Sequence, residues 1–253
     1  MMGYGVRTLL QKEIRRFMRV AGQTLFGPLL TTSLYFIVFG LSVGRHLTVV
    51  GGVPYIRFIV PGLITLGVVT NALLNTSSSL FSMKIAGTIV DLLVTPLSYG
   101  EMLFAFLVAA VTRALLVGGL MFLVAGIFTT FELAHPLATL GILLVIALGF
   151  ASLGLIVGIW ADKFEQVNFV PSFVIQPMTF LGGVFYSVND IPGVLATITR
   201  ANPVFYMVDL VRYAMLGTHD APLLLGSVIL GGLTVGAMAV AHEMLRRGYK
   251  LRG

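Results

Sequence analysis

Long apolar segments, separated by short polar stretches, make up most of the chain. A helix needs about 20 mostly apolar residues to cross the hydrocarbon core of a bilayer. The chain has about six such segments, which lie at residues 25–43, 58–80, 101–128, 137–160, 167–187 and 221–244. The pattern therefore predicts an all-α polytopic membrane protein with about six transmembrane helices.

The composition agrees with this prediction and excludes several other classes. Of 253 residues, 57% are hydrophobic and 10% are charged, which leaves too little polar surface for a soluble domain. The sequence has no cysteine, so it cannot form disulfides or thiolate metal sites, and its four histidines lack ligand spacing, so we expect no metal. The net charge of +6 does not indicate nucleic acid, because the basic residues flank apolar segments, where lipid head groups attract them.

The basic residues also predict the orientation of the chain. If the N-terminus is cytoplasmic, eleven Lys and Arg residues lie inside and four lie outside, with Arg113 within the third span. Cytoplasmic loops of membrane proteins carry such an excess of positive charge. We therefore expect both termini in the cytoplasm.

The first 22 residues precede the first span and are amphipathic. In "VRTLLQKEIRRFMRVA", Leu10, Ile14, Phe17 and Ala21 share one helical face, while Lys12, Arg15, Arg16 and Arg19 lie on another. This arrangement is typical of a helix that lies in the membrane interface. The alternative is an ordinary basic flank that only sets topology.

The first cytoplasmic loop contains a second amphipathic segment, at residues 84–95. Ile85, Ile89, Leu92 and Leu93 recur at helical spacing, Lys84, Thr88 and Asp91 lie elsewhere, and Pro96 ends the pattern. We expect a short helix held at the membrane surface. Its apolar stripe either docks a partner or packs on the protein's own helix ends.

Residues 188–217 contain two apolar pieces, near 191–198 and 203–216, that are too short to span a membrane. Asp209 and Arg212 stand three residues apart in the second piece and can form an ion pair. The segment is expected to form a re-entrant helical hairpin on the outer face. For a simple pair, reversing both charges would restore part of what one reversal removes.

Two predicted spans carry polar stripes at helical spacing. The second has Asn71, Asn75, Ser78 and Ser82, and the fifth has Asn168, Ser172, Gln176 and Thr179. Polar side chains are unfavourable against lipid, so these stripes are expected to face a partner helix or a cavity, as a dimer seam, a pathway lining, or both. Arg113 is either functional or a structural, carbonyl-bonded arginine.

The chain resembles the ABC-2 type permeases, which are membrane subunits of one group of ATP-binding-cassette exporters. The resemblance rests on "GTIVDLLVTPLS" after the second span, "LGGVFYSVNDIP" closing the fifth, and "NPVFYMVDLVRYAMLG" before the sixth. It extends almost from end to end and is nearest to the YadH/NodJ-like branch.

The resemblance implies a division of labour between this chain and a separate ATPase. In such permeases the N-terminal helix and the loop after the second span dock on an ABC ATPase subunit, and the outer hairpin covers the mouth. The residues implied in ATPase coupling are Glu13, Arg15, Arg16, Lys84, Thr88, Ile89 and Asp91, with a smaller contact from Asp162, Lys163 and Glu165. The chain has no G-x-x-x-x-G-K-[ST] sequence, so it is expected to be a permease subunit and not an enzyme, with ATP and Mg²⁺ bound by the partner.

The implied assembly contains two copies of this chain and two ATPase subunits in a bacterial inner membrane. Family members move amphiphiles, and polar amides beside Met178, Phe169 and Phe180 suit an apolar body with a polar head. The alternative is a secondary transporter or channel without an ATPase, although no Asp or Glu lies clearly at the centre of a span. An intramembrane serine protease is also disfavoured, because the serines at 77–79 have no His or Lys base within a span.

Overall fold

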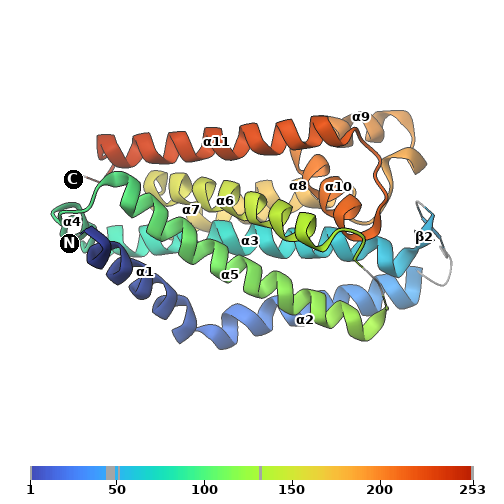
Figure 1. Ribbon diagram of the computed structural model, residues 1–253, viewed down its shortest axis with the longest axis horizontal. Coiled ribbons are helices and arrows are strands. Elements are labelled where there is room, and N and C mark those ends of the chain that lie inside the picture. The colour runs from blue at the N-terminus through green and yellow to red at the C-terminus, as the bar shows by residue number, and fades with distance from the viewer. Residues whose placement is uncertain (1, 44–48, 51, 131–132, 252–253) are drawn as a thin grey trace.

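The computed structural model describes residues 2–43, 49–50, 52–130 and 133–251, and this part of the chain is an elongated helical bundle (Figure 1). The predicted all-α fold is confirmed. Its elements are α1 (Met2–Arg19), η1 (Gly22–Phe26), α2 (Gly27–Tyr35), η2 (Phe36–Val43), α3 (Tyr55–Ile85), α4 (Ile89–Leu93), α5 (Tyr99–Phe128), α6 (Pro136–Trp160), α7 (Phe164–Phe169), η3 (Val170–Ile175), α8 (Gln176–Phe180), η4 (Val188–Asp190), α9 (Gly193–Ala201), α10 (Pro203–Leu216) and α11 (Leu223–Arg247). Two short antiparallel strands, β1 (Val49–Val50) and β2 (Val53–Pro54), precede α3.

Helix α3 is the centre of the bundle and packs against α5, α6 and α10. It is the most buried of the long apolar helices, because neighbours surround it on nearly every side. Its contact with α6 is close: a Cβ built on Gly154 would lie 2.2 Å from the Leu73 carbonyl oxygen. The Thr76 hydroxyl donates a hydrogen bond across this contact to the Ala151 carbonyl at 2.7 Å. Small residues and interhelical hydrogen bonds are the usual means by which membrane helices associate.

Among the described residues, four helices are long and apolar enough to cross a membrane, namely α3, α5, α6 and α11. A fifth span results if Gly3–Arg19 and Thr24–Phe39, which meet at 76°, are taken together. The predicted fifth span at 167–187 corresponds to three short pieces, α7, η3 and α8, with π-helical turns in the middle. The total of six spans therefore stays a prediction.

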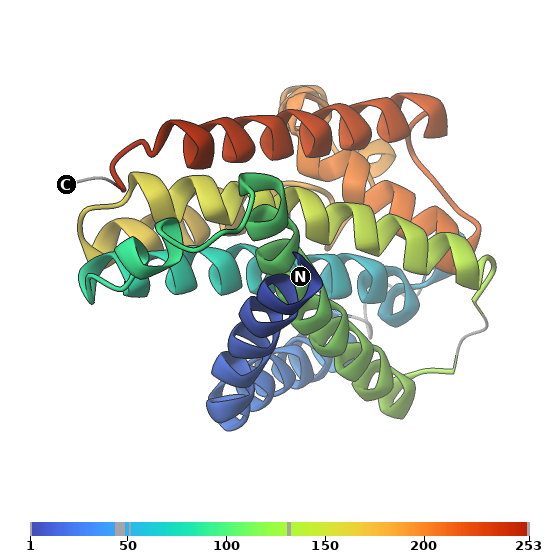
Figure 2. The same cartoon turned by 60° about the vertical axis from the view of Figure 1, so that its left-hand side comes forward.

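Helices α1 and α2 both pack on α5 and lie to one side of the other long helices (Figure 2). The inward face of α1 consists of Leu9, Glu13 and Phe17, all buried. Of the apolar face predicted from the sequence, Phe17 is buried, whereas Leu10, Ile14 and Ala21 are only half-buried. Whether α1 lies in the membrane interface stays a prediction, but α1 is a packed part of the bundle.

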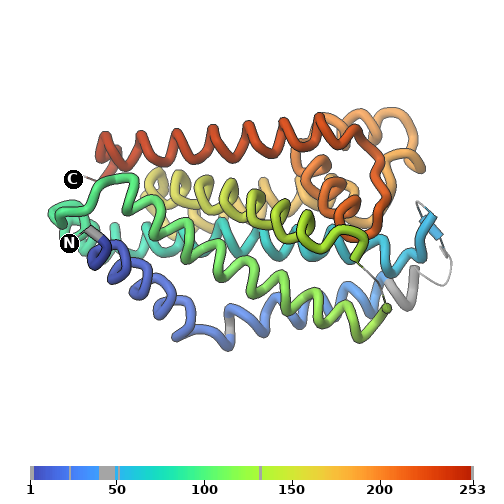
Figure 3. The backbone as a smooth tube through the Cα atoms, viewed as in Figure 1, coloured from blue at the N-terminus to red at the C-terminus, as the bar shows by residue number. Residues whose placement is uncertain are grey.

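The two ends of the bundle differ in what they carry. The start of α1, the end of α11 and helix α4 lie at one end, and β2 and α9 lie at the other (Figure 3). Both described chain ends thus share a side with the predicted cytoplasmic loop. We call these the α4 end and the α9 end.

Candidate functional site

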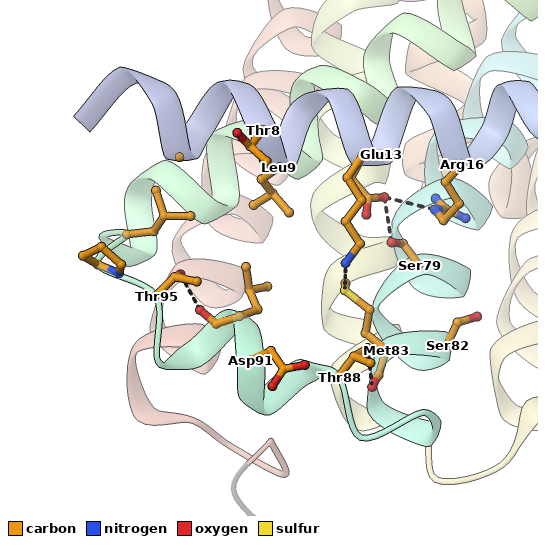
Figure 4. Close-up of a pocket in the computed structure, with 15 residues that line it drawn as sticks. Thr8, Leu9, Glu13, Arg16, Ser79, Ser82, Met83, Thr88, Asp91 and Thr95 are labelled. Atoms are coloured by element: carbon orange, nitrogen blue, oxygen red, sulfur yellow. Dashed lines mark hydrogen bonds and ion pairs between the residues drawn. The ribbon is translucent and has the colours of Figure 1, made fainter. Parts of the chain in front are cut away.

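A groove of about 1030 Å³ opens at the α4 end, between α1 and the chain that follows α3 (Figure 4). Glu13 and Arg16 of α1 point into it from one wall, and Asp91 and Thr95 lie on the opposite wall. Met83 of α3 lies at its base. The groove therefore joins the two segments that the sequence singled out as amphipathic.

Helix α4 is shorter than the predicted 84–95 helix. Helix α3 continues to Ile85, and the chain then turns at Gly87, whose φ of +71° favours a residue without a side chain. Ile89 and Leu92 are buried in the protein's own core, so this part of the apolar stripe packs on the bundle, whereas Ile85 is exposed. Ile89 consequently does not lie on the surface.

The outward side of this loop is a different set of residues. Ile85, Val90 and Val94 are 67%, 55% and 77% exposed. Asp91 and Thr88 are exposed among them. We call Ile85, Thr88, Val90, Asp91 and Val94 the α4 face. Exposed apolar side chains gathered around a charge are typical of an interaction surface.

Glu13 was expected on a docking surface, but its side chain is fully buried. It accepts a hydrogen bond from the Ser79 hydroxyl at 2.6 Å and pairs with Arg16 Nε at 3.1 Å. A buried carboxylate needs such partners, since an unpaired buried charge is strongly destabilising. Glu13 thus fastens α1 to α3, whereas Arg15 remains exposed on the outer side of α1.

Arg16 and Arg113 meet at the second-span polar stripe. Arg16 Nη2 donates to the Asn75 backbone carbonyl at 2.7 Å and to Asn75 Oδ1 at 3.1 Å. Arg113 of α5 donates to the same Oδ1 at 3.4 Å and to Asn71 Oδ1 at 3.2 Å. We call Glu13, Arg16, Asn71, Asn75 and Arg113 the arginine cluster. It explains why α3 carries buried amides.

The remaining stripe residues divide between interior and surface. On α3, Ser78 is half-buried and Ser82 is exposed at the groove. On the 164–180 segment, Thr179 is buried and donates to the Ile175 carbonyl at 2.8 Å. The other members of that stripe are exposed and form no side-chain hydrogen bond within the described chain: Asn168, Ser172 and Gln176.

Lys84 closes the end of α6 and does not extend from the α4 face. Its Nζ donates to the carbonyls of Ile159 at 3.2 Å and Ala161 at 2.8 Å, and pairs with Asp162 at 3.0 Å. Lys250 bonds to the other Asp162 oxygen at 2.5 Å. Hydrogen bonds from Lys250, the larger effect, and from Lys84 hold the pKa of the Asp162 carboxyl below its usual range. We call Lys84, Asp162 and Lys250 the clasp, because they connect α3, the end of α6 and the C-terminal segment. Lys163 and Glu165 are exposed beside it.

At the α9 end, the 188–217 segment contains the two helices α9 and α10, and the expected pair of Asp209 and Arg212 is present at 3.6 Å. That the segment is a re-entrant hairpin on the outer face stays a prediction. Both side chains of the pair are buried. Arg212 lies 4.0 Å from the centre of the Phe58 ring. Asp209 accepts backbone hydrogen bonds from Asp220 at 2.8 Å and Ala221 at 3.0 Å. The site at 212 thus requires a cation, which lies against the Phe58 ring, and the site at 209 requires an acceptor for two backbone N–H groups.

Comparison with known proteins assigns the chain to a family. Residues 4–216 match the family described as ABC-2 type transporter. The chain belongs to the ABC-2 type transporter family. The resemblance found in the sequence is therefore confirmed, and the chain is a membrane subunit of an ABC transporter.

Two relatives of this permease match over most of their length. The inner membrane transport permease YadH of Escherichia coli strain K12 is 37% identical over 98% of this chain and 96% of its own. Nodulation protein J of Rhizobium meliloti strain 1021 is 30% identical over 90% of this chain and 88% of its own. Both relatives belong to the YadH/NodJ-like branch that the sequence predicted. The name of the first, together with the apolar helices of this chain, supports a multi-pass protein of the inner membrane.

Some residues that shape these sites were not singled out in the sequence. Ser79 and Met83 gave no signal, because their roles depend on α1 folding back onto α3. Lys250 and Asp220 were likewise not predicted, although they pair with Asp162 and Arg212. Their partners lie on other elements, and nothing in local periodicity marks them.

The buried geometry at the α9 end predicts that reversing both charges will not restore the permease. Asp209→Arg with Arg212→Asp would place a cation against two N–H donors and a carboxylate over the Phe58 ring. Asp209→Ala alone should lower the free energy of unfolding by about 3–5 kcal/mol, because it leaves the buried Arg212 with only the longer ion pair to Asp220 at 3.8 Å and takes the acceptor from the N–H groups of Asp220 and Ala221. Thermal unfolding of the purified variants measures both effects.

The exposed pair of Glu243 and Arg247, 2.6 Å apart, serves as the control. Exchanging those two residues should leave the unfolding temperature nearly unchanged, because solvent screens the pair. Recovery of wild-type stability by the double reversal at 209 and 212 would contradict the prediction.

Proposed function

We propose that two copies of this chain form the translocation pathway of an exporter, and that separate ABC ATPase subunits drive it from the α4 end. The observation that carries this proposal is the α4 face, an exposed apolar patch around Asp91 beside an open groove. The chain has no phosphate-binding loop of the Walker type, so nucleotide and Mg²⁺ would be held by the partner. Both chain ends would then be cytoplasmic.

The α4 face would be the main contact with the ATPase. Ile89 and Leu92 anchor α4 in the core, which keeps Val90 and Val94 turned outward. Burying such apolar side chains against a partner is favourable by about 1.5–3 kcal/mol for each large residue that becomes fully covered. Asp91 adds a charge that selects the orientation of the partner.

The clasp beside the α4 face would give a second contact with the ATPase and would transmit a movement of α4 to α3 and α6. Lys163 and Glu165 are exposed next to Asp162, so an ATPase surface that reaches α4 could also touch them. A shift of α4 would pull on α3, whose last turn is bonded through Lys84 to the end of α6. The ATPase would thus act on the two helices that pack closely at the centre of the bundle.

The dimer seam would lie along the 164–180 segment. Asn168, Ser172 and Gln176 are exposed, and lipid would leave their polar groups without hydrogen-bond partners. The π-helical turns of η3 lie in the same segment, and such turns occur frequently at functional sites. The buried amides of the second-span stripe, Asn71 and Asn75, are bonded to α1 and α5 and would not form the seam.

The first span would border this seam at the α9 end. Phe39 stacks on Phe185 with ring centres 4.3 Å apart. The rings of Tyr35 and Phe180 meet edge to face, with their centres 6.3 Å apart. Exposed Phe169 and Phe173 lie among the polar residues of the seam. A pathway with this mixture of amides, hydroxyls and aromatic rings suits an amphiphile with an apolar body and a polar head.

Docking at the α4 face is tested by Val90→Asp combined with Val94→Asp. Both side chains are exposed, so the permease should still fold, while desolvating two carboxylates should weaken co-purification of the ATPase at least about tenfold. The matched control is Val194→Asp on α9, since Val194 is 79% exposed at the opposite end. Unchanged ATPase binding by the double variant, or equal loss in the control, would exclude this surface.

The seam is tested by single cysteines, which are informative because the chain has none of its own. Ser172→Cys and Gln176→Cys should form crosslinks between two copies in the membrane. Asn75→Cys should not, because Asn75 is buried inside one copy. Ser227→Cys on α11, also an exposed serine, is the control and should remain uncrosslinked. Crosslinking at position 227 without crosslinking at 172 would move the seam elsewhere.

A further inference from the structure

The arginine cluster contains buried polar atoms of both kinds, acceptor and donor, that the described chain leaves without partners. Glu13 Oε1 is an acceptor, and Asn75 Nδ2 and Arg113 Nε are donors. The three residues are already neighbours through Arg16, which pairs with Glu13 and shares the Asn75 Oδ1 acceptor with Arg113. Buried polar groups in proteins are nearly always satisfied. The unused acceptor and the unused donors would satisfy one another if Glu13 lay closer to Asn75 and Arg113.

The charges of the cluster favour the same change. Arg113 takes part in no ion pair of the described chain, and its hydrogen bonds go to the neutral amides of Asn71 and Asn75. The one carboxylate of the cluster, Glu13, pairs with Arg16 only. A charged side chain within a membrane span is unfavourable unless it is paired. A carboxylate placed between the two guanidinium groups would compensate both.

Helix α3 turns a row of side chains towards α1 and α5 at intervals of four residues, so its members lie one helical turn apart: Asn71, Asn75, Ser79 and Met83. We call these four residues the contact row. Three side chains of α1 bind the row in the reverse order of sequence: Lys12 at Met83, Glu13 at Ser79 and Arg16 at Asn75. The two helices therefore run antiparallel. A shift of α1 by one turn brings each of its side chains to the next member of the row.

Only one direction of shift improves these contacts. One turn towards the α9 end would bring Glu13 to Asn75, beside Arg113, where Glu13 Oε1 can accept from Asn75 Nδ2 and Arg113 Nε. Arg16 would remain next to Glu13, because both belong to α1. One turn towards the α4 end would instead bring Glu13 to Met83, whose thioether has no donor.

We propose that α1 has two registers on α3, one helical turn apart, and that the structure holds the register nearer the α4 end. Shifts of one element past another by one turn are a documented form of switching. The chain bends by 76° between Gly3–Arg19 and Thr24–Phe39, where the π-helical η1 lies, and such a junction can absorb the shift.

This switch deepens the proposed function, on which its role in transport rests. Helix α1 forms one wall of the groove at the α4 end. An ATPase that contacts this wall would favour one register over the other. The choice of register would change the partners of Arg113 within the membrane, so α1 would carry a movement of the ATPase into α5.

The two registers are tested on the purified full chain in dodecyl maltoside, without any ATPase. Spin labels are attached at Arg15→Cys on α1 and Val194→Cys on α9, which are exposed positions in a chain without cysteine. Val194 lies at the end of the bundle towards which α1 would move. Double electron–electron resonance should resolve two distances that differ by up to about 5 Å, the rise of one helical turn.

Variants should shift the two populations in opposite directions. Ser79→Ala removes a bond that Glu13 makes only in the described register, so it should raise the ratio of the shorter to the longer distance at least about tenfold. Arg113→Met, added to Ser79→Ala, removes the partner in the second register and should reverse that rise. If the Arg113→Met protein does not fold, Arg113→Gln replaces it. Glutamine keeps a donor without the charge, so it should still reverse the rise severalfold.

The matched controls are Ser82→Ala, an exposed serine of α3, and Arg19→Met, an exposed arginine of α1 outside the cluster. Both should leave the ratio unchanged. One unchanged distance in all variants, equal shifts in the controls, or a rise that the position-113 variants do not reverse would refute the two registers. The proposed function is tested separately, by ATPase co-purification, so its failure can be told from the failure of the switch.

Discussion

The buried carboxylate of Glu13 is the interaction on which the arrangement of the α4 end depends. It binds Ser79 of α3 and Arg16 of its own helix, and Arg16 in turn binds Asn75. These bonds, together with longer ones from Lys12 to the sulfur of Met83 and from Arg16 to Ser78, hold the basic helix α1 against α3. A buried charge of this kind destabilises the fold unless it is paired, and the pairing of Glu13 with Arg16 and Ser79 favours one position for α1. That position creates one wall of the groove.

The same contacts explain how events at the α4 end would reach the membrane-spanning part. Helix α3 ends at the clasp formed by Lys84 and Asp162, beside the α4 face, and its middle carries the amides of the arginine cluster. A partner that moves α4 therefore acts on a helix already bonded to α1, α5 and α6. The close approach of Gly154 to Leu73 leaves little room for α3 to move independently of α6.

Much of the fold could be predicted because membrane helices are recognised in a sequence by their length and apolarity. The pair of Asp209 and Arg212 and the helix α1 could be predicted from local spacing. The helical periodicity of apolar or polar residues does not reveal which neighbouring helix packs against them. Ile89 and Leu92 were correctly identified as one apolar face, yet that face is turned into the bundle. The Asn71 and Asn75 stripe meets Arg16 and Arg113 of the same chain, because α1 and α5 come from distant sequence.

The central claim is that Glu13 anchors α1 to α3, and a double-mutant cycle tests it most directly. Glu13→Gln, Ser79→Ala and the double variant are compared by denaturant unfolding of the purified permease. The account predicts a coupling energy of about 1.5–3 kcal/mol, the range for a hydrogen bond to a charged group. Additivity of the two single effects to within about 0.5 kcal/mol would contradict it.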